Sequence, residues 1–380
     1  MWKKVQEMSL SDWFSQLCSH QSVHYTAAAV SSDSDPVVLQ AGQHYIRLRL
    51  AEMYLKDDRK LFRSYVPVVS SVVSLQFGSN SAQQLADVAG PLSLNLSEDV
   101  LGRGVETNYH LTNLVPYKGG TVSVSAALLA YESKDYFSSF LKLANGVAGI
   151  LTTGQLSSYL KVADTAVSGI QDLLDGADKE VYLVYHNEYG GSDSSGGVSL
   201  KSGYTAVIGA DKTSFDTSKL YVKDSSLLYG NTKDSAQPLT GYDYMLLAVE
   251  SAVARDDFRE FAGYSTMLSS ALEKGITDQS AGETIIESEM IAVFKSDDLT
   301  YVDKTRVAAA LKAEYDQRLS QVTSLKGLGT GESGDDWLNC RTRAMDPGHI
   351  FQQIQPLTEN RSGEEAADLI VSLICRGEIG

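Results

Sequence analysis

Cysteine is scarce in this chain, and its three cysteines, Cys18, Cys340 and Cys375, are widely separated. An odd number of distant thiols does not make a disulfide framework, and isolated thiols are typical of proteins in a reducing compartment. The first residues contain two lysines but no apolar run, so we expect no signal peptide. These features together predict a cytoplasmic protein.

Positive charge is also scarce, because 32 lysines and arginines stand against 48 aspartates and glutamates and leave a net charge of −16. A phosphate backbone is bound over a broad face by clustered cations that release counterions, so we expect no nucleic-acid partner. The sequence nowhere holds about 18 consecutive apolar residues, the length that spans a bilayer. We therefore expect no constitutive transmembrane helix.

The common catalytic and cofactor motifs are absent as well. The sequence has no GxxxxGKS or GxxxxGKT phosphate loop, no GxSxG elbow and no HExxH zinc site. A GxGxxG spacing occurs at Gly329, Gly331 and Gly334, but it follows a helical pattern and leads into two aspartates, whereas a phosphate site follows a strand. We interpret it, together with Gly327, as a flexible or cleavable linker. We assign no catalytic residue, no cofactor and no metal site.

Aspartates in two polar loops are the residues that could most readily form a metal site. Asp33 and Asp35 lie in one such loop and Asp193 in another, and Ca²⁺ takes several hard oxygen ligands from adjacent loops. Aspartate and serine are also ordinary turn residues. We favour the turn interpretation, because these aspartates supply fewer ligands than a calcium site needs.

Period-two alternation gives the clearest structural signal in the sequence. Ile46, Leu48 and Leu50 share one side of a predicted strand, and Arg47 and Arg49 share the other. We expect further strands in the first two thirds of the chain, at residues 22–30, 73–77, 180–188, 203–209, 219–223 and 242–249. Residues 113–132 read as a hairpin that turns at a Gly-Gly pair, and the charged residues 56–65 as a loop or short helix.

These patterns predict an α+β protein: an antiparallel β-sandwich-like domain with a helical-hairpin insertion, followed by a helical C-terminal domain. Its short, evenly spaced strands favour a sandwich or an open barrel over a parallel sheet. The predicted segments are an N-terminal helix (1–20), the sandwich-like domain (21–253) with its insertion (136–176), a helical domain (254–325), a Gly-rich linker (326–336) and a tail with a short helix (337–380).

The helical insertion has two interpretations. Its small residues and low charge allow a hairpin that leaves the body and enters a bilayer. Helices that cover one face of a sheet have the same pattern, and Asp164, Asp172 and Asp175 do not suit an anionic membrane. We favour packing over membrane binding.

Tyrosine is abundant, with twenty residues, and many of them fall in the second half of the β region. Tyrosine is a favoured strand residue, but an aromatic surface also binds protein partners. The candidate partner surface consists of Tyr182, Tyr185, Tyr204, Tyr221, Tyr242 and Tyr244.

The missing motifs favour a non-enzymatic protein-interaction module, such as a scaffold, adaptor or regulatory subunit. Its expected partner is another protein or a second copy of the chain. Two alternatives stay open. One is a latent membrane-acting effector whose hairpin at 136–174 is released by cleavage or partner binding, and the other is a hydrolase with a site at the sandwich loops that uses Asp33, Asp193 or His186.

Overall fold

The computed structural model describes Phe14, residues 25–56, 59–60, 63–76, 82–90, 105–132, Ser157, Ile170, and residues 179–190, 199–261 and 263–328. Within these residues the chain forms antiparallel sheets followed by three helices. The predicted N-terminal helix, the insertion at 136–176 apart from Ser157 and Ile170, and the tail at 337–380 lie outside the described residues. No helix among those described combines the length and apolarity needed to cross a bilayer.

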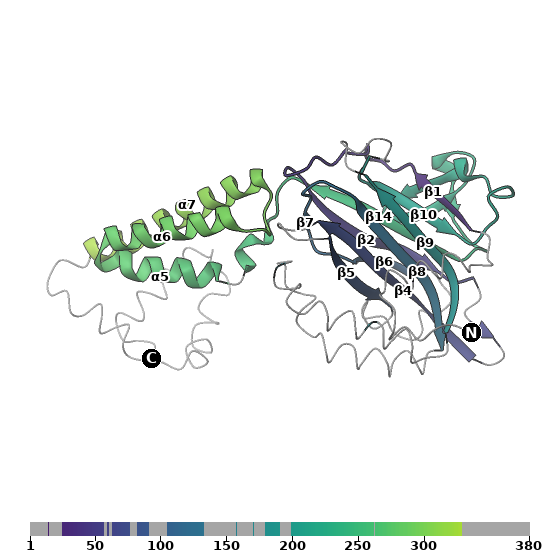
Figure 1. The fold of residues 1–380 in the computed structure, drawn as a ribbon, viewed down its shortest axis with the longest axis horizontal. Helices are drawn as coiled ribbons and strands as arrows, with labels where there is room; N and C mark the ends of the chain where they lie inside the picture. Colours follow the sequence, from purple (N-terminus) through teal and green to yellow (C-terminus); the bar gives the residue numbers. More distant parts are fainter. Residues whose placement is uncertain are drawn as a thin grey trace. The chain divides into compact units, whose positions relative to one another are not determined.

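The first sheet has six strands, and its main path runs β1-β10-β14-β2-β6, with every neighbouring pair antiparallel (Figure 1). Its interior strand β2, between β14 and β6, is the one that alternation predicts most clearly. The strands are β1 (Thr26–Val30), β2 (Tyr45–Tyr54), β6 (Val105–His110), β7 (Val115–Pro116), which pairs with β2, β10 (Gly203–Ile208) and β14 (Tyr244–Ala252).

The second sheet has five strands in the order β3-β4-β8-β9, and β5 also pairs with β4. Apart from the two-residue β3, its strands are long, and β4, β5 and β8 are rich in valine, alanine and leucine, a composition that suits burial. They are β3 (Arg59–Lys60), β4 (Arg63–Gln76), β5 (Ala82–Ala89), β8 (Val122–Glu132) and β9 (Lys179–Tyr189).

A third, small sheet of β11 (Leu220–Lys223), β12 (Ser226–Tyr229) and β13 (Gln237–Pro238) lies against the first. Asp224 and Ser225 join β11 to β12 with φ angles of 50° and 68°, as a two-residue hairpin turn requires. The buried Glu52 of β2 accepts a hydrogen bond from the backbone N–H of Leu227 at 2.8 Å. This bond fixes the small sheet to β2.

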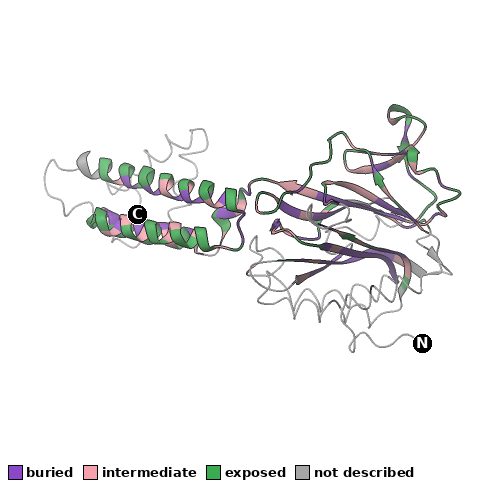
Figure 2. Ribbon diagram, turned by 45° about the horizontal axis from the view of Figure 1, so that its top comes forward, coloured by how far each residue is buried: buried purple, intermediate pink, exposed green. Residues whose placement is uncertain are grey.

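Two hydrophobic clusters occupy opposite sides of the first sheet. The larger one combines Ile46 and Leu48 of that sheet with Val68 and Leu128 of the second, and it also includes the buried Phe14. The smaller one lies under the small sheet, and its main members are Ala51, Ala206, Ile208, Phe215, Leu220, Val222, Leu227, Leu239, Tyr244 and Leu246. Buried residues accordingly dominate the strands in Figure 2.

Three helices follow the sheets: α5 (Tyr264–Thr277), α6 (Gln279–Lys295) and α7 (Tyr301–Leu328). Asp278 caps α6 by accepting from the N–H of Ala281, and Thr300 caps α7 by accepting from the N–H of Asp303. These helices begin within the predicted helical domain, 254–325, and α7 extends past the expected start of the linker to include Gly327.

The chain divides into two compact units, Met1–Met267 with Glu287–Ala310 and Leu268–Ile286 with Leu311–Gly380. In the second unit, Gly275 and Gly282 meet the buried ring of Tyr315. A Cβ added at either glycine would collide with the Tyr315 hydroxyl, so the close helix contact depends on both glycines.

In the first unit, the start of α7 is joined to β2 by buried polar contacts. The Tyr45 hydroxyl donates to Asp303 Oδ2 at 2.7 Å, and the N–H of Arg255 donates to the same oxygen at 3.1 Å. The side chain of Arg255 is fully buried, and its Nε and Nη2 each donate to the Asp257 carboxylate at 2.7 Å. Burial raises the pKa of Tyr45, which keeps its hydroxyl protonated as a donor.

Two local expectations are wrong. Gly119 and Gly120 do form a turn, with φ of 94° and 77°, but β7 pairs with β2 while β8 pairs with β4 and β9, so residues 113–132 are not a hairpin. Residues 59–60 and the start of β4 form an antiparallel pair rather than a loop or helix. In both places the local sequence indicates a turn or a charged segment. Which residues form a strand, and with which partner, depends on pairing with distant parts of the chain.

Candidate functional site

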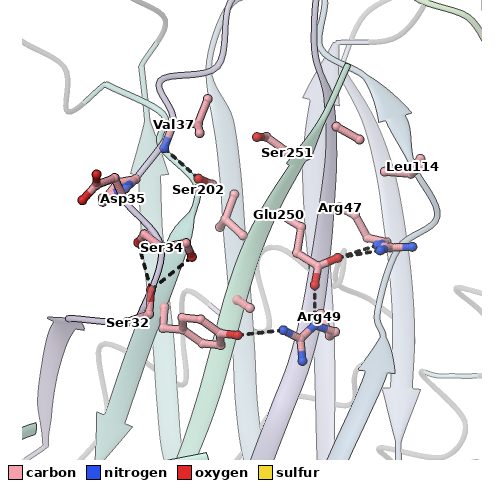
Figure 3. Close-up of a pocket in the computed structure, with 16 residues that line it drawn as sticks. Ser32, Ser34, Asp35, Val37, Arg47, Arg49, Leu114, Ser202, Glu250 and Ser251 are labelled. Carbon is pink, nitrogen blue, oxygen red and sulfur yellow. Dashed lines mark hydrogen bonds and ion pairs between the residues drawn. The ribbon is translucent and has the colours of Figure 1, made fainter. Parts of the chain in front are cut away.

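A pocket of about 470 Å³ opens on the first sheet, on the side opposite the larger cluster. Strands β2, β10 and β14 form its floor, and residues 32–37 form one wall (Figure 3). Its polar lining consists of Ser32, Ser34, Asp35, Arg47, Arg49, Ser202, Tyr204, Glu250 and Ser251.

The alternation of β2 places two arginines in this pocket. Ile46, Leu48 and Leu50 belong to the larger cluster, so the side chains between them face the other way. Arg47 and Arg49 both line the pocket. The prediction that these arginines share the side away from the core is confirmed.

Glu250 of β14 binds both arginines. Its Oε2 accepts from Arg47 Nε at 2.8 Å and lies 2.7 Å from Arg47 Nη2, and its Oε1 accepts from Arg49 Nε at 2.5 Å. Strand register explains this pairing, because Glu250 lies directly opposite Arg47, and Ala248 directly opposite Arg49. One carboxylate therefore forms ion pairs with two guanidinium groups.

Arg49 is the more deeply held of the two arginines, with only 9% of its side chain exposed. Its Nη2 donates to the Tyr204 hydroxyl at 3.0 Å, and its Nη1 donates to Asn108 Oδ1 and, at 3.3 Å, to Ser225 Oγ. Tyr204 lies opposite Ala248 on the next strand, so the small Ala248 side chain leaves room for Arg49 and Tyr204 to meet above it. These contacts fix the guanidinium in one position.

The backbone positions two of these partners through left-handed conformations. Asn108 has φ of 42°, a region that asparagine tolerates better than most residues. Ser225 has φ of 68° at the β11–β12 turn, and this turn brings its hydroxyl to Arg49. The small sheet therefore helps to hold Arg49 in position.

The electrostatics of the pocket follow from this geometry. Burial alone would raise the pKa of Glu250, but hydrogen bonds from Arg49 and Arg47 and their charges outweigh it and leave that pKa lowered. Burial, followed by the charge of Arg47, lowers the pKa of the nearby His110. Near neutral pH the carboxylate is therefore charged and the imidazole neutral.

The pocket presents hydrogen-bond donors and hydroxyl groups that are held by neighbouring side chains. Its two arginines are fixed by one carboxylate, and its hydroxyls come from serines and a tyrosine. Within the part of the chain that the structure describes, no group of three or more His, Cys, Asp or Glu residues is placed to hold a metal ion. Arginine and tyrosine side chains of this kind recognise ligands through charge-assisted hydrogen bonds and aromatic contact.

The six predicted tyrosines are not gathered on one face. Tyr204 lines the pocket, and Tyr242 is 37% exposed beside Phe215. Tyr185 and Tyr244 are buried, at 5% and 1% exposure. The remaining two are half-buried, on β9 and β11: Tyr182 and Tyr221. Of this set, the structure brings Tyr204 alone into the pocket.

The other sequence candidates are scattered. Asp33 forms an ion pair with Lys233, Asp35 lines the pocket, and Asp193 lies outside the described residues. Gly329, Gly331 and Gly334 also lie outside them.

His186 has a neighbour that a hydrolase would use. Its Nδ1 lies 2.9 Å from Ser125 Oγ, and its Nε2 lies 3.8 Å from Glu188 Oε1. Ser125 is only 5% exposed and is the direct register partner of His186 on β8. The pair is a cross-strand hydrogen bond of the second sheet, and the 3.8 Å separation is too long for Glu188 to orient the ring.

Sequence reasoning missed Glu250, Asn108 and Ser225 as parts of the site. Glu250 is 201 residues from Arg49, and no motif connects them. The only signal in the sequence was the pair of arginines on the polar side of a predicted strand.

Comparisons of the chain with protein-family models, with curated proteins and with solved structures found no match.

Proposed function

We propose that this chain is a non-enzymatic protein-interaction module and that the pocket on the first sheet is its partner-binding site. The observation that carries the proposal is the arginine pair, held in place by Glu250 and Tyr204 at the floor of an open pocket. A prearranged guanidinium group loses little side-chain freedom on binding, so its hydrogen bonds contribute more to affinity.

The rim of the pocket supports a macromolecular partner. Val37 lines the pocket at 46% exposure, and its neighbour Val38 is 43% exposed. Exposed aliphatic side chains beside arginine and tyrosine resemble the composition of interface centres. The partner in this proposal is another protein or a second copy of the chain.

We propose three further features of the whole chain. We infer that the two larger sheets form a sandwich, which is supported by the cluster that takes residues from both. The proposed helical hairpin at 136–176 is supported by its sequence periodicity, and a cytoplasmic location by the isolated thiols.

A matched pair of exposed valines tests the binding function. Val37→Asp places a charge on the pocket rim, whereas Val253→Asp places one at a 61% exposed position that does not line the pocket. Analytical ultracentrifugation of the full chain measures self-association, and affinity capture from source cells measures a stoichiometric partner. We expect Val37→Asp to lose the association and Val253→Asp to keep it. A monomeric native chain without a stoichiometric partner, or equal behaviour of the two variants, would overturn the proposal.

A further inference from the structure

We infer that the pocket recognises a carboxylate group of the partner, and that Arg47 is the residue that binds it. This inference rests on the proposed function, because it names the chemistry by which the same pocket selects its partner. The carboxylate belongs to an acidic side chain or to the end of a polypeptide.

The charge balance of the arginine pair favours an anionic ligand. Glu250 is the carboxylate that binds Arg47 and Arg49, so these three groups keep an excess of one positive charge, which Asp35 balances only from the opposite wall of the pocket. Both oxygens of Glu250 are already engaged. A second carboxylate would complete the pairing that the protein itself leaves incomplete.

The two arginines differ in exposure and in how many of their donors are already used. Arg49 makes four hydrogen bonds to protein groups and has 9% of its side chain exposed. Arg47 has 27% of its side chain exposed, and among the described residues its Nη1 has no hydrogen-bond partner. Figure 3 shows one terminal nitrogen of Arg47 turned away from Glu250, where its donors are open to a ligand.

The negative charges of the pocket favour a carboxylate over a phosphate as the bound anion. Asp35 lines the wall on the far side of the pocket, and Glu250 lies in the floor (Figure 3). A phosphate dianion would meet both negative charges, whereas a carboxylate carries one charge on two oxygens that match the guanidinium fork. The Ser251 hydroxyl in the lining suits an amide group of a polypeptide beside that carboxylate, whereas Ser32 and Ser34 hydrogen-bond to each other and Ser202 Oγ accepts from the N–H of Val37.

His110 provides a built-in reporter of binding. The charge of Arg47 contributes to lowering the pKa of its imidazole, and the charge of Glu250 opposes that effect. A bound carboxylate acts in the same direction as Glu250. Occupancy at Arg47 therefore raises the pKa of His110.

The experiment is an NMR titration of the His110 imidazole in the full chain, assigned with a His110→Gln variant. Sodium acetate is the first probe, and sodium chloride at equal ionic strength is its control. We expect acetate to raise the pKa of His110 saturably and chloride to have no such effect. A capped peptide with one glutamate and a peptide with a free C-terminus then distinguish the two sources of carboxylate, and inorganic phosphate tests the selectivity.

Three variants make the result specific to Arg47. Arg47→Gln should weaken acetate binding by about tenfold or more, which corresponds to about 1.4 kcal/mol. Glu250→Gln should strengthen binding, because the amide oxygen can still accept from Arg47 and orient it, while the negative charge that competes with the ligand is removed. Lys201→Gln removes a positive charge from an exposed residue next to Ser202 and should leave binding unchanged. If Arg47→Gln does not fold, the opposite effect of Glu250→Gln still tests the inference.

Failure of this inference is distinguishable from failure of the proposed function. No saturable acetate effect in both the native chain and Glu250→Gln would overturn carboxylate recognition, as would tighter binding of phosphate. The binding function would still stand if Val37→Asp alone lost the partner. Equal association of the Val37→Asp and Val253→Asp variants would instead overturn the proposed function itself.

Discussion

Asp87 should make the stability of the second sheet depend on pH in the direction opposite to that of most aspartates. It lies on β5 with 7% exposure, opposite Ser71 of β4. The N–H of Val88 donates to its Oδ1 at 2.6 Å, and the Tyr109 hydroxyl approaches the same oxygen at 3.4 Å. Burial nevertheless dominates and raises the pKa of Asp87 from 3.8 to about 7.

The magnitude follows from linkage. Between pH 3.8 and about 7 the folded chain holds a proton on Asp87 that the unfolded chain has lost, so stability falls as pH rises. Each unit of pKa difference corresponds to about 1.4 kcal/mol, and the whole shift therefore to about 4 kcal/mol. This stability is fully present below the Asp87 pKa of the unfolded chain. It is lost once the pH has risen past the Asp87 pKa of the folded chain.

Asp87→Asn removes this titration while its amide oxygen can still accept from Val88. Urea unfolding of the variant and the native chain, followed by circular dichroism, gives the difference in free energy of unfolding at each pH. From about pH 5 to about pH 8, the free energy of unfolding of the variant should rise by roughly 3 kcal/mol relative to that of the native chain. Asp35→Asn, the same change at an exposed aspartate, should show a difference that stays within about 0.5 kcal/mol. Parallel curves for Asp87→Asn and the native chain would refute the reasoning.

Three further outcomes test other parts of the structure. Gly275→Ala should destabilise the chain by about 1–3 kcal/mol, because its Cβ meets the Tyr315 hydroxyl, and Tyr315→Phe should largely remove that cost in a double-mutant cycle of urea midpoints. Arg255→Met should cost about 3–5 kcal/mol in the same assay, since it leaves the partners of a buried cation unpaired; a loss below about 1 kcal/mol would contradict this. Glu250→Gln without added ligand should lower the His110 pKa, because it removes the charge that raises it, and NMR titration would expose an unchanged or raised value.

The sequence predicts the fold best where burial on one side leaves a periodic pattern. Ile46, Leu48 and Leu50 identify β2 and place Arg47 and Arg49 on its other side. β5 was missed because its sequence, AQQLADVA, has one β-branched residue and no clear alternation; it becomes a strand through pairing with β4.

The candidate site was predictable only in part, for a related reason. Two arginines on a polar strand face are an ordinary solvated surface until another strand supplies a carboxylate between them. Glu250 does this from a distant position, and the register of β14 against β2 puts it opposite Arg47. Register is a property of the folded sheet, so neither the pairing nor the pocket has a local signature.

The contrast between Arg47 and Arg49 also indicates which residue is available for function. Burying a guanidinium is costly unless its hydrogen bonds are satisfied, and Arg49 is satisfied by Glu250, Tyr204, Asn108 and Ser225. A ligand that displaced any of these partners would leave a buried group unpaired. Arg49 therefore has a structural role in the pocket and does not bind the ligand. Arg47 retains solvent and unused donors while Glu250 fixes its orientation. A ligand can therefore gain hydrogen bonds at Arg47 without breaking those that hold the sheet together.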